Sequence, residues 1–168
     1  NVGVRVYPIG RLDMDTEGLL LCTNDGAFAD AMMHPRGGIE KIYLVKVAGA
    51  LSTEKLAVLR GPMFLDGYLL RPVTVEVVGR EGNGTILKMT LHEGRNRQVR
   101  RMCEQAGLRV IHLKRISVGS LTLGRLSSGQ WRYLTDEELL FLRGQIAAEE
   151  TVSKKNTQKN ADPKNGAK

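Results

Sequence analysis

One carboxylate in this 168-residue sequence stands where it could do chemistry. Asp13 follows Arg11 in a glycine-bounded loop directly after a strand-like run, and further acids follow at alternate positions. A single aspartate in such a loop usually stabilises a turn or caps a helix. A catalytic role requires Asp13 to lie in a cleft beside positive charge, where an arginine would hold its carboxylate ionised.

A basic segment later in the chain can supply that charge. Residues 94–115 contain seven Arg or Lys against one Glu, in a chain whose whole formal net charge is +7. Charge concentrated in this way is typical of a surface that binds a polyanion. The density of arginine over lysine favours nucleic acid over the alternative, an ordinary solvated helix face.

The basic segment also predicts a helix over 95–106. Its apolar face consists of four residues at helical spacing, namely Val99, Met102, Cys103 and Ala106. Three arginines lie opposite on a helical projection. Arg100 is closest to the apolar face, so we expect its side chain to be half-buried and to form an ion pair. Arg97 and Arg101 are expected to point outward, available to phosphates.

The elements that must position these residues predict a strand-rich α+β fold. Alternating apolar residues indicate strands at 2–7, 18–23, 41–47, 73–78, 85–92, 109–114, 120–123 and 130–134. A hairpin turn is expected at 81–84. The other predicted helices are 25–33, 53–60 and 135–143, the last with a capping box of Thr135 and Glu138 and an end at Gly144.

The composition supports one folded domain and a tail. Apolar residues make up 42% of the chain, which is enough for one sizeable core. We predict a folded domain over residues 1–147. We predict a disordered, lysine-rich tail over 148–168, because no large apolar residue follows Val152 and the segment cannot offset the entropy of ordering.

Membrane and secretory classes are disfavoured. The longest apolar run is far shorter than the roughly 18 residues of a membrane helix, and no signal-peptide pattern opens the chain. Cys22 and Cys103 lie far apart, so a reduced, cytoplasmic protein is expected. The sequence lacks an initiator methionine and opens inside a strand-like run, which we interpret as a piece of a longer protein.

No metal or cofactor is expected. His34, His92 and His112 are scattered along the chain. The loop from Asp13 begins like a calcium-binding EF-hand loop, but Asn24 stands where the bidentate carboxylate is required. Phosphate-binding, dinucleotide-binding and serine-nucleophile motifs are absent from the sequence.

Four motifs, taken together, resemble the RsuA/RluB type of RNA pseudouridine synthase. They are residues 10–26 (GRLDMDTEGLLLCTNDG), 41–45 (KIYLV), 93–102 (EGRNRQVRRM) and 129–135 (GQWRYLT). They occur in the order typical of that family. The resemblance implies a catalytic domain with a mixed, mainly antiparallel sheet and short flanking helices. It also implies that an N-terminal S4 RNA-binding domain and a first strand, usual in the family, are missing here.

The resemblance assigns roles position by position. Asp13 matches the catalytic aspartate, and Arg100 the basic residue that pairs with it. Tyr43 matches the tyrosine that packs against the target base and acts as its general base, whereas residue-level reasoning alone favours a place for Tyr43 in the strand core. Arg11 matches the arginine that fills the space left by a flipped nucleotide. Further RNA contacts are predicted from the basic segment, at Arg95, Arg97, Arg101, Lys114 and Arg115.

The predicted function is conversion of a uridine in structured ribosomal RNA to pseudouridine by a cytoplasmic, monomeric enzyme without a cofactor or an obligate protein partner. Overall likeness favours large-subunit (23S) RNA as the substrate. The rival prediction is a non-catalytic RNA-binding or ribosome-assembly module, which gives no reason for a carboxylate on a phosphate-attracting surface. A glycoside hydrolase could use Asp13 and Asp15, but aromatic residues make up only 5% of the chain, too few for the usual sugar platforms.

Overall fold

The computed structural model describes residues 2–34 and 38–160, with only the helical backbone described from 149 onward. Within this part of the chain the strands are β1 Tyr7–Pro8, β2 Glu17–Gly18, β3 Cys22–Thr23, β4 Lys41–Ala48, β5 Phe64–Leu65, β6 Tyr68–Leu69, β7 Thr74–Glu81, β8 Gly84–Leu91, β9 Val110–Val118 and β10 Leu121–Thr122. The helices are α1 Gly26–Met33, α2 Thr53–Arg60, α3 Gln98–Gln105 and α4 Asp136–Asn160.

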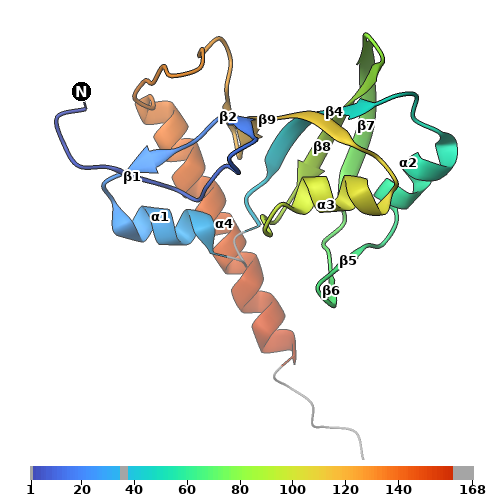
Figure 1. Cartoon of the computed structure of the whole chain (residues 1–168). Helices are drawn as coiled ribbons and strands as arrows, with labels where there is room; N and C mark the ends of the chain where they lie inside the picture. Colours follow the sequence, from blue (N-terminus) through green and yellow to red (C-terminus); the bar gives the residue numbers. More distant parts are fainter. Residues whose placement is uncertain (1, 35–37, 161–168) are drawn as a thin grey trace, which may run out of the picture.

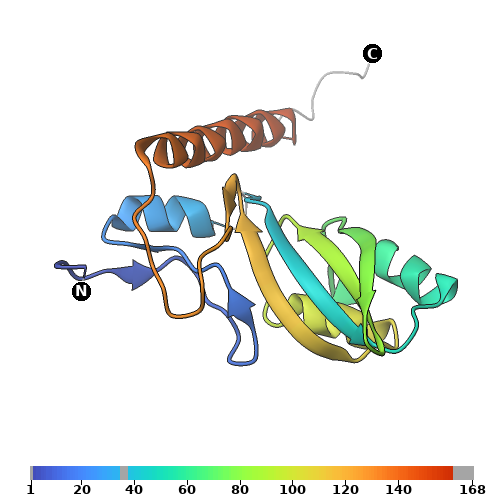
Figure 2. The same cartoon turned by 90° about the horizontal axis from the view of Figure 1, so that it is seen from above.

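The central sheet is mixed and mainly antiparallel, which confirms the predicted fold class. Its strands run in the order β10-β9-β4-β8-β7, and β2 adds a short parallel pairing to β9. In Figure 2 the long strands β4 and β9 lie side by side across the middle of the molecule. The predicted hairpin also forms, because β7 and β8 are joined at Gly82 and Asn83.

Two hydrophobic clusters pack against this sheet. One joins β4, β8 and β9 to α2 and α3 through side chains such as Val45, Leu87 and Met102. The other joins α1, α4 and the segment around β2 and β3 through side chains such as Ala29, Leu21 and Leu142. Figure 1 shows the helices separated in the same way, with α2 and α3 on one side and α1 and α4 on the other. Burial of these side chains, at roughly 1.5–3 kcal/mol each, is the main force that holds the loops between the clusters in place.

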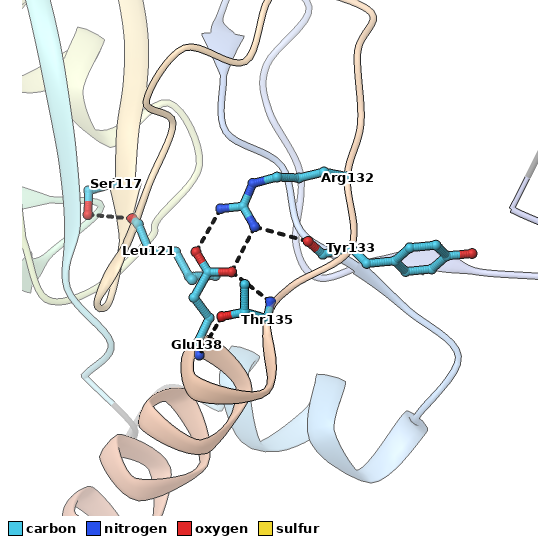
Figure 3. A network of polar contacts seen from close by, with 6 residues as sticks. All are labelled: Ser117, Leu121, Arg132, Tyr133, Thr135 and Glu138. Atoms are coloured by element: carbon cyan, nitrogen blue, oxygen red, sulfur yellow. Dashed lines mark hydrogen bonds and ion pairs between the residues drawn. The ribbon is translucent and has the colours of Figure 1, made fainter.

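The capping box at the start of α4 is confirmed. The backbone N–H of Thr135 donates to Glu138 Oε2 (2.9 Å), and the N–H of Glu138 donates to Thr135 Oγ1 (3.2 Å) (Figure 3). Arg132 donates to both carboxylate oxygens of Glu138, each at 2.7 Å. The hydrogen bonds from Arg132 and from the Thr135 N–H lower the pKa of Glu138 to about 2.

Several predicted elements are wrong in their bounds or are absent. The strand predicted at 18–23 is two short strands, β2 and β3, because β2 pairs with β9 whereas β3 pairs with β1. The helix predicted over 95–106 begins at Gln98, because Arg97 adopts a left-handed backbone conformation (φ 47°). Residues 130–134 form no strand, since this segment turns at Gly129 and pairs with no neighbouring strand. The strand predicted at 2–7 is reduced to Tyr7–Pro8.

The predicted tail differs as well. Helix α4 continues through Gly144 to Asn160, so the predicted disorder does not hold for residues 148–160. Neither glycine nor proline occurs between 145 and 160, and the polar and alanine residues there are compatible with a helix. Residues 161–168 lie outside the described part of the chain.

Candidate active site

A cavity of about 550 Å³ opens where the two hydrophobic clusters meet. Its floor is the face of the sheet, formed by Leu91 from β8, Lys41 and Tyr43 from β4, and Leu113 and Arg115 from β9. Alternate residues of a strand share a face, and Tyr43 is the register partner of Arg115, so these two side chains are neighbours. The walls are two loops, residues 8–13 and 93–97.

The loop that carries Asp13 is fastened to β9. The N–H of Thr16 donates to the Asp13 carbonyl (2.9 Å) and closes a turn. Further along, the N–H of Leu19 donates to the Arg115 carbonyl (2.8 Å), and Arg115 Nε donates to the Leu19 carbonyl (2.8 Å). Gly18 permits this close approach, because a Cβ there would lie 2.1 Å from the Arg115 carbonyl oxygen. Asp13 and Arg11 are thereby held at the wall of the cavity.

A second loop, residues 93–97, brings arginines to the opposite wall. Glu93 Oε1 accepts hydrogen bonds from the Arg71 N–H (2.9 Å) and from Gln98 Nε2 (3.2 Å). Gln98 Oε1 in turn accepts from the Arg95 N–H (3.0 Å). This network sets the loop conformation and places Arg95 and Arg97 in the cavity wall. The guanidinium of Arg95 also lies over the ring of Tyr68 at 3.3 Å, a cation–π contact.

Arg100 binds Asp15, not Asp13 as predicted. Its side chain is 14% exposed, which confirms the predicted half-burial, and its Nε lies 3.3 Å from Asp15 Oδ2. The same guanidinium donates to the Asp15 carbonyl. The turn at Asp13 directs the Asp15 carboxylate toward α3, because the two acids are separated by a reversal of the chain. Arg100 therefore contacts the loop that carries Asp13 two residues beyond its predicted partner.

Arg97 interacts with both acids of the loop, Asp15 and Asp13. Its two terminal nitrogens donate to the two carboxylate oxygens of Asp15, at 3.0 and 3.1 Å. The pKa of Arg97 is raised by this hydrogen bonding to Asp15 and, to a smaller extent, by the charge of Asp13. The pKa of Asp15 is lowered chiefly by the Arg97 hydrogen bonds. Burial opposes this effect, and the charge of Arg100 lowers the pKa further, by less than burial raises it.

The predicted site residues fall into two groups. The cavity brings together Asp13, Tyr43, Arg11, Arg95, Arg97 and Arg115. The others lie outside the cavity lining: Arg100 is bound to Asp15, Arg101 donates to both oxygens of Asp66 in the β5–β6 hairpin, and Lys114 lies 3.5 Å from Glu17. Arg115, predicted as a surface contact, is only 5% exposed.

Sequence reasoning missed three residues of the site. Lys41 lines the cavity floor, and burial together with the charges of Arg115 and Arg71 lowers its pKa to about 8. The sequence pattern that could have identified Lys41 is its position two residues before Tyr43, which places both on the same face of the strand. Glu93 and Gln98 hold the second loop, and the signal for Gln98 was a polar residue on the apolar side of the predicted helix.

Comparisons with known proteins identify the family of this chain. A family model described as RNA pseudouridylate synthase matches residues 1–105. The chain belongs to this family. Its curated relatives include ribosomal large subunit pseudouridine synthase B of Bacillus subtilis (strain 168), which is 45% identical over 145 residues. They also include an uncharacterized RNA pseudouridine synthase of Aquifex aeolicus (strain VF5), 42% identical over 135 residues. These names support the RsuA/RluB type within the RNA pseudouridine synthases.

Pseudouridine synthases share the fold as well. A crystal structure of a pseudouridylate synthase matches this chain with a TM-score of 0.73 and 31% sequence identity. The match covers 82% of this chain and 59% of the chain in that crystal structure. The chain spans only part of its relatives: the match covers 85% of this chain but 59% of the Bacillus protein, and 80% but 54% of the Aquifex protein.

Within residues 2–34 and 38–160, side chains of His, Cys, Asp and Glu form no group of three or more that could hold a metal ion. The helices of that same part are too short or too polar to cross a lipid bilayer.

Proposed function

We propose that this chain converts a uridine of ribosomal RNA to pseudouridine, with Asp13 as the catalytic carboxylate. The observation that carries the proposal is the placement of Asp13 at the wall of a cavity that has Tyr43 on its floor and several cations around it. A carboxylate in such a place attacks or removes a proton from whatever the cavity binds. The cations attract RNA.

The reaction is an isomerisation and needs neither an oxidant nor an energy source. The C1′–N1 bond of the uridine breaks, the uracil ring turns, and C5 of the ring bonds to C1′. Asp13 could act in three ways: by attack on C1′, by addition to C6 of the ring, or by removal of the C2′ proton. No cofactor is required by any of the three routes.

The other residues of the cavity receive roles from their positions. A uridine in structured RNA must leave its stack, which costs a few kcal/mol, and Tyr43 offers the flipped ring an aromatic surface and a general base. Arg11 fills the space that the base leaves, and Arg95 contacts phosphates at the rim. Arg97 is bound by Asp15, so a phosphate contact from Arg97 requires it to leave that carboxylate. Arg100 acts through Asp15, as a positioning residue for the catalytic loop.

The two alternatives are weaker. A non-catalytic RNA-binding module has no use for Asp13, because a carboxylate beside the arginines repels phosphate. A glycoside hydrolase needs a second carboxyl group that stays protonated as the general acid. Asp15 cannot fill that role, since its arginine partners lower its pKa.

The substrate we favour is 23S ribosomal RNA, because the named Bacillus relative is a large-subunit enzyme. We further propose that the protein acts as a cytoplasmic monomer without an obligate protein partner. Arg101 and Lys114 remain candidates for peripheral RNA contacts, for which each would have to exchange its present carboxylate partner for a phosphate.

The test is direct mapping of pseudouridine. Unmodified transcripts of 23S and 16S ribosomal RNA are incubated with the wild-type chain, with Asp13→Asn and with Asp30→Asn. Asp30 is an exposed carboxylate on α1 outside the cavity lining and serves as the matched control. We expect pseudouridine at one site with the wild type and Asp30→Asn, and none with Asp13→Asn at unchanged RNA affinity. Turnover by Asp13→Asn would refute the catalytic assignment.

A further inference from the structure

Two cations on the cavity floor have no carboxylate partner. Lys41 Nζ donates to the Ile39 carbonyl (2.9 Å), and Arg115 Nε donates to the Leu19 carbonyl (2.8 Å). Within the described residues, neither side chain forms an ion pair with an acid, whereas the arginines of the cavity rim and of α3 do. A buried charge is costly unless it is paired.

The two cations also destabilise each other. The charge of Arg115 lowers the pKa of Lys41, in addition to the larger effect of burial. Arg115 has a structural reason to be there, because it fastens the loop of Asp13 to β9. Lys41 has no comparable task, since its carbonyl partner is only two residues away on its own strand end. The floor therefore carries positive charge that the protein itself does not neutralise.

The position of Lys41 indicates which part of the RNA substrate its ammonium group would contact. The rim arginines are the more exposed, with side-chain exposures of 40% for Arg95 and 44% for Arg97, and they face the RNA backbone outside. Lys41 lies on the sheet face two residues from Tyr43, which the proposed function places against the flipped base. On that proposal the phosphates stay with the RNA backbone outside, and the uracil ring is the group that comes next to Lys41.

We propose that Lys41 is a catalytic residue that binds a carbonyl oxygen of the target uracil and stabilises the negative charge of the ring during the reaction. This inference rests on the proposed function. When the C1′–N1 bond breaks, its electron pair stays on the ring and spreads over N1, O2 and O4. The sugar carbon then bonds to the Asp13 carboxylate, or C2′ loses its proton to that carboxylate. If the carboxylate adds to C6 first, the displaced pair moves to O4.

Every route thus places charge on a ring carbonyl oxygen. The electron pair on the ring then forms the C5–C1′ bond, and the carboxylate is released or returns the C2′ proton. The C5 proton passes to the general base, for which we propose Tyr43, and N1 takes up a proton, so the product is a neutral isomer of uridine. An ammonium group next to O2 or O4 stabilises this charged ring more than it stabilises the neutral uridine. Catalysis requires this difference, because only an interaction that is stronger in the transition state than in the ground state raises the rate.

The test compares Lys41→Met, Lys41→Arg and the control Lys46→Met. Lys46 lies on β4, as Lys41 does, and is paired with the exposed Glu81 of β7. Single-turnover rates are measured on 23S and 16S transcripts that contain either uridine or 5-fluorouridine, and RNA affinity is measured in parallel. Fluorine withdraws electrons and stabilises the ring anion by itself. On uridine we expect Lys41→Met to lose about 100-fold in rate at unchanged affinity, with partial recovery in Lys41→Arg and no loss in Lys46→Met.

The decisive comparison is the second substrate. On 5-fluorouridine RNA, cleavage of the C1′–N1 bond by Lys41→Met should be reduced much less than on uridine. An equal loss on both substrates, or a loss that appears wholly in RNA affinity, would overturn the role of Lys41 while leaving the proposed function intact. Failure of the wild-type chain to form pseudouridine in any transcript would instead refute the proposed function, and the role of Lys41 with it.

Discussion

Arg97 and Asp15 form a two-point ion pair that joins the start of α3 to the loop carrying Asp13. Arg97 adopts a left-handed backbone conformation at φ 47°, which is unfavourable for a residue with a side chain by roughly 1–2 kcal/mol. Asp15 accepts two hydrogen bonds from Arg97 in this conformation, and Arg100 binds the same acid from the next turn of the helix. One acid thus sets the distance between the two walls of the cavity.

Asp15→Asn should weaken this connection. We expect the single-turnover rate to fall about tenfold, since loss of a catalytic group's alignment has this order of effect. RNA affinity should not fall, because Arg97 becomes available to a phosphate. The salt dependence of binding should steepen by about 0.7–0.9 in log–log slope. The check is to measure the rate and the RNA affinity at several salt concentrations from about 50 to 200 mM. Over this range the affinity depends strongly on the number of phosphate contacts. A variant that loses affinity at an unchanged rate would contradict the positioning role.

Lys41 should make stability depend on pH. Its folded pKa of about 8 lies below the ordinary 10.5, so the unfolded chain binds more protons between these values and stability rises with pH across that window. Lys41→Met should be more stable than the wild type below pH 8 by up to about 3 kcal/mol, and this difference should shrink as the pH approaches 10.5. Urea unfolding at several pH values measures it. Lys46→Met, at an exposed ion pair, should show no such trend.

Gly18 and Gly144 should respond to alanine in opposite directions. At Gly18 the added Cβ would lie 2.1 Å from the backbone oxygen of Arg115, and the φ of +116° is itself unfavourable for alanine. We expect a loss of about 3 kcal/mol or more. Gly144 has no atom within 4 Å of an added Cβ and lies inside α4, so alanine should stabilise the protein by about 0.5–1 kcal/mol. Thermal unfolding of both variants tests the pair, and a stable Gly18→Ala would contradict the described contact with β9.

The two cysteines should differ in reactivity. Cys103 is fully buried on the inner face of α3, and burial raises the pKa of its thiol to about 12 despite the opposing charge of Arg100. Cys22 is exposed. A thiol reagent at pH 8 should therefore modify one cysteine quickly in the folded protein and two after denaturation. Rapid modification of both in the native state would show that α3 opens readily.

Local patterns in the sequence were sufficient for much of the framework. The apolar spacing of Val99, Met102 and Cys103 predicts the buried face of α3, because a helix repeats every 3.6 residues and burial follows that period. Thr135 and Glu138 predict the start of α4, since both bonds of a capping box lie within four residues. The motif order placed Asp13 and Tyr43 in one site, and both line the cavity.

Only the tertiary structure decided how the charges pair. Arg100 and Asp15 are 85 positions apart, and whether Arg100 meets Asp13 or Asp15 depends on the backbone angles of a turn and on the register of β2 against β9. The burial of Lys41 and Arg115 likewise requires the two loops to close over the sheet. The periodicity of apolar residues predicts which side of a helix or strand is buried. The electrostatic environment of a side chain depends on segments far away in the sequence, and these come together only in the folded protein.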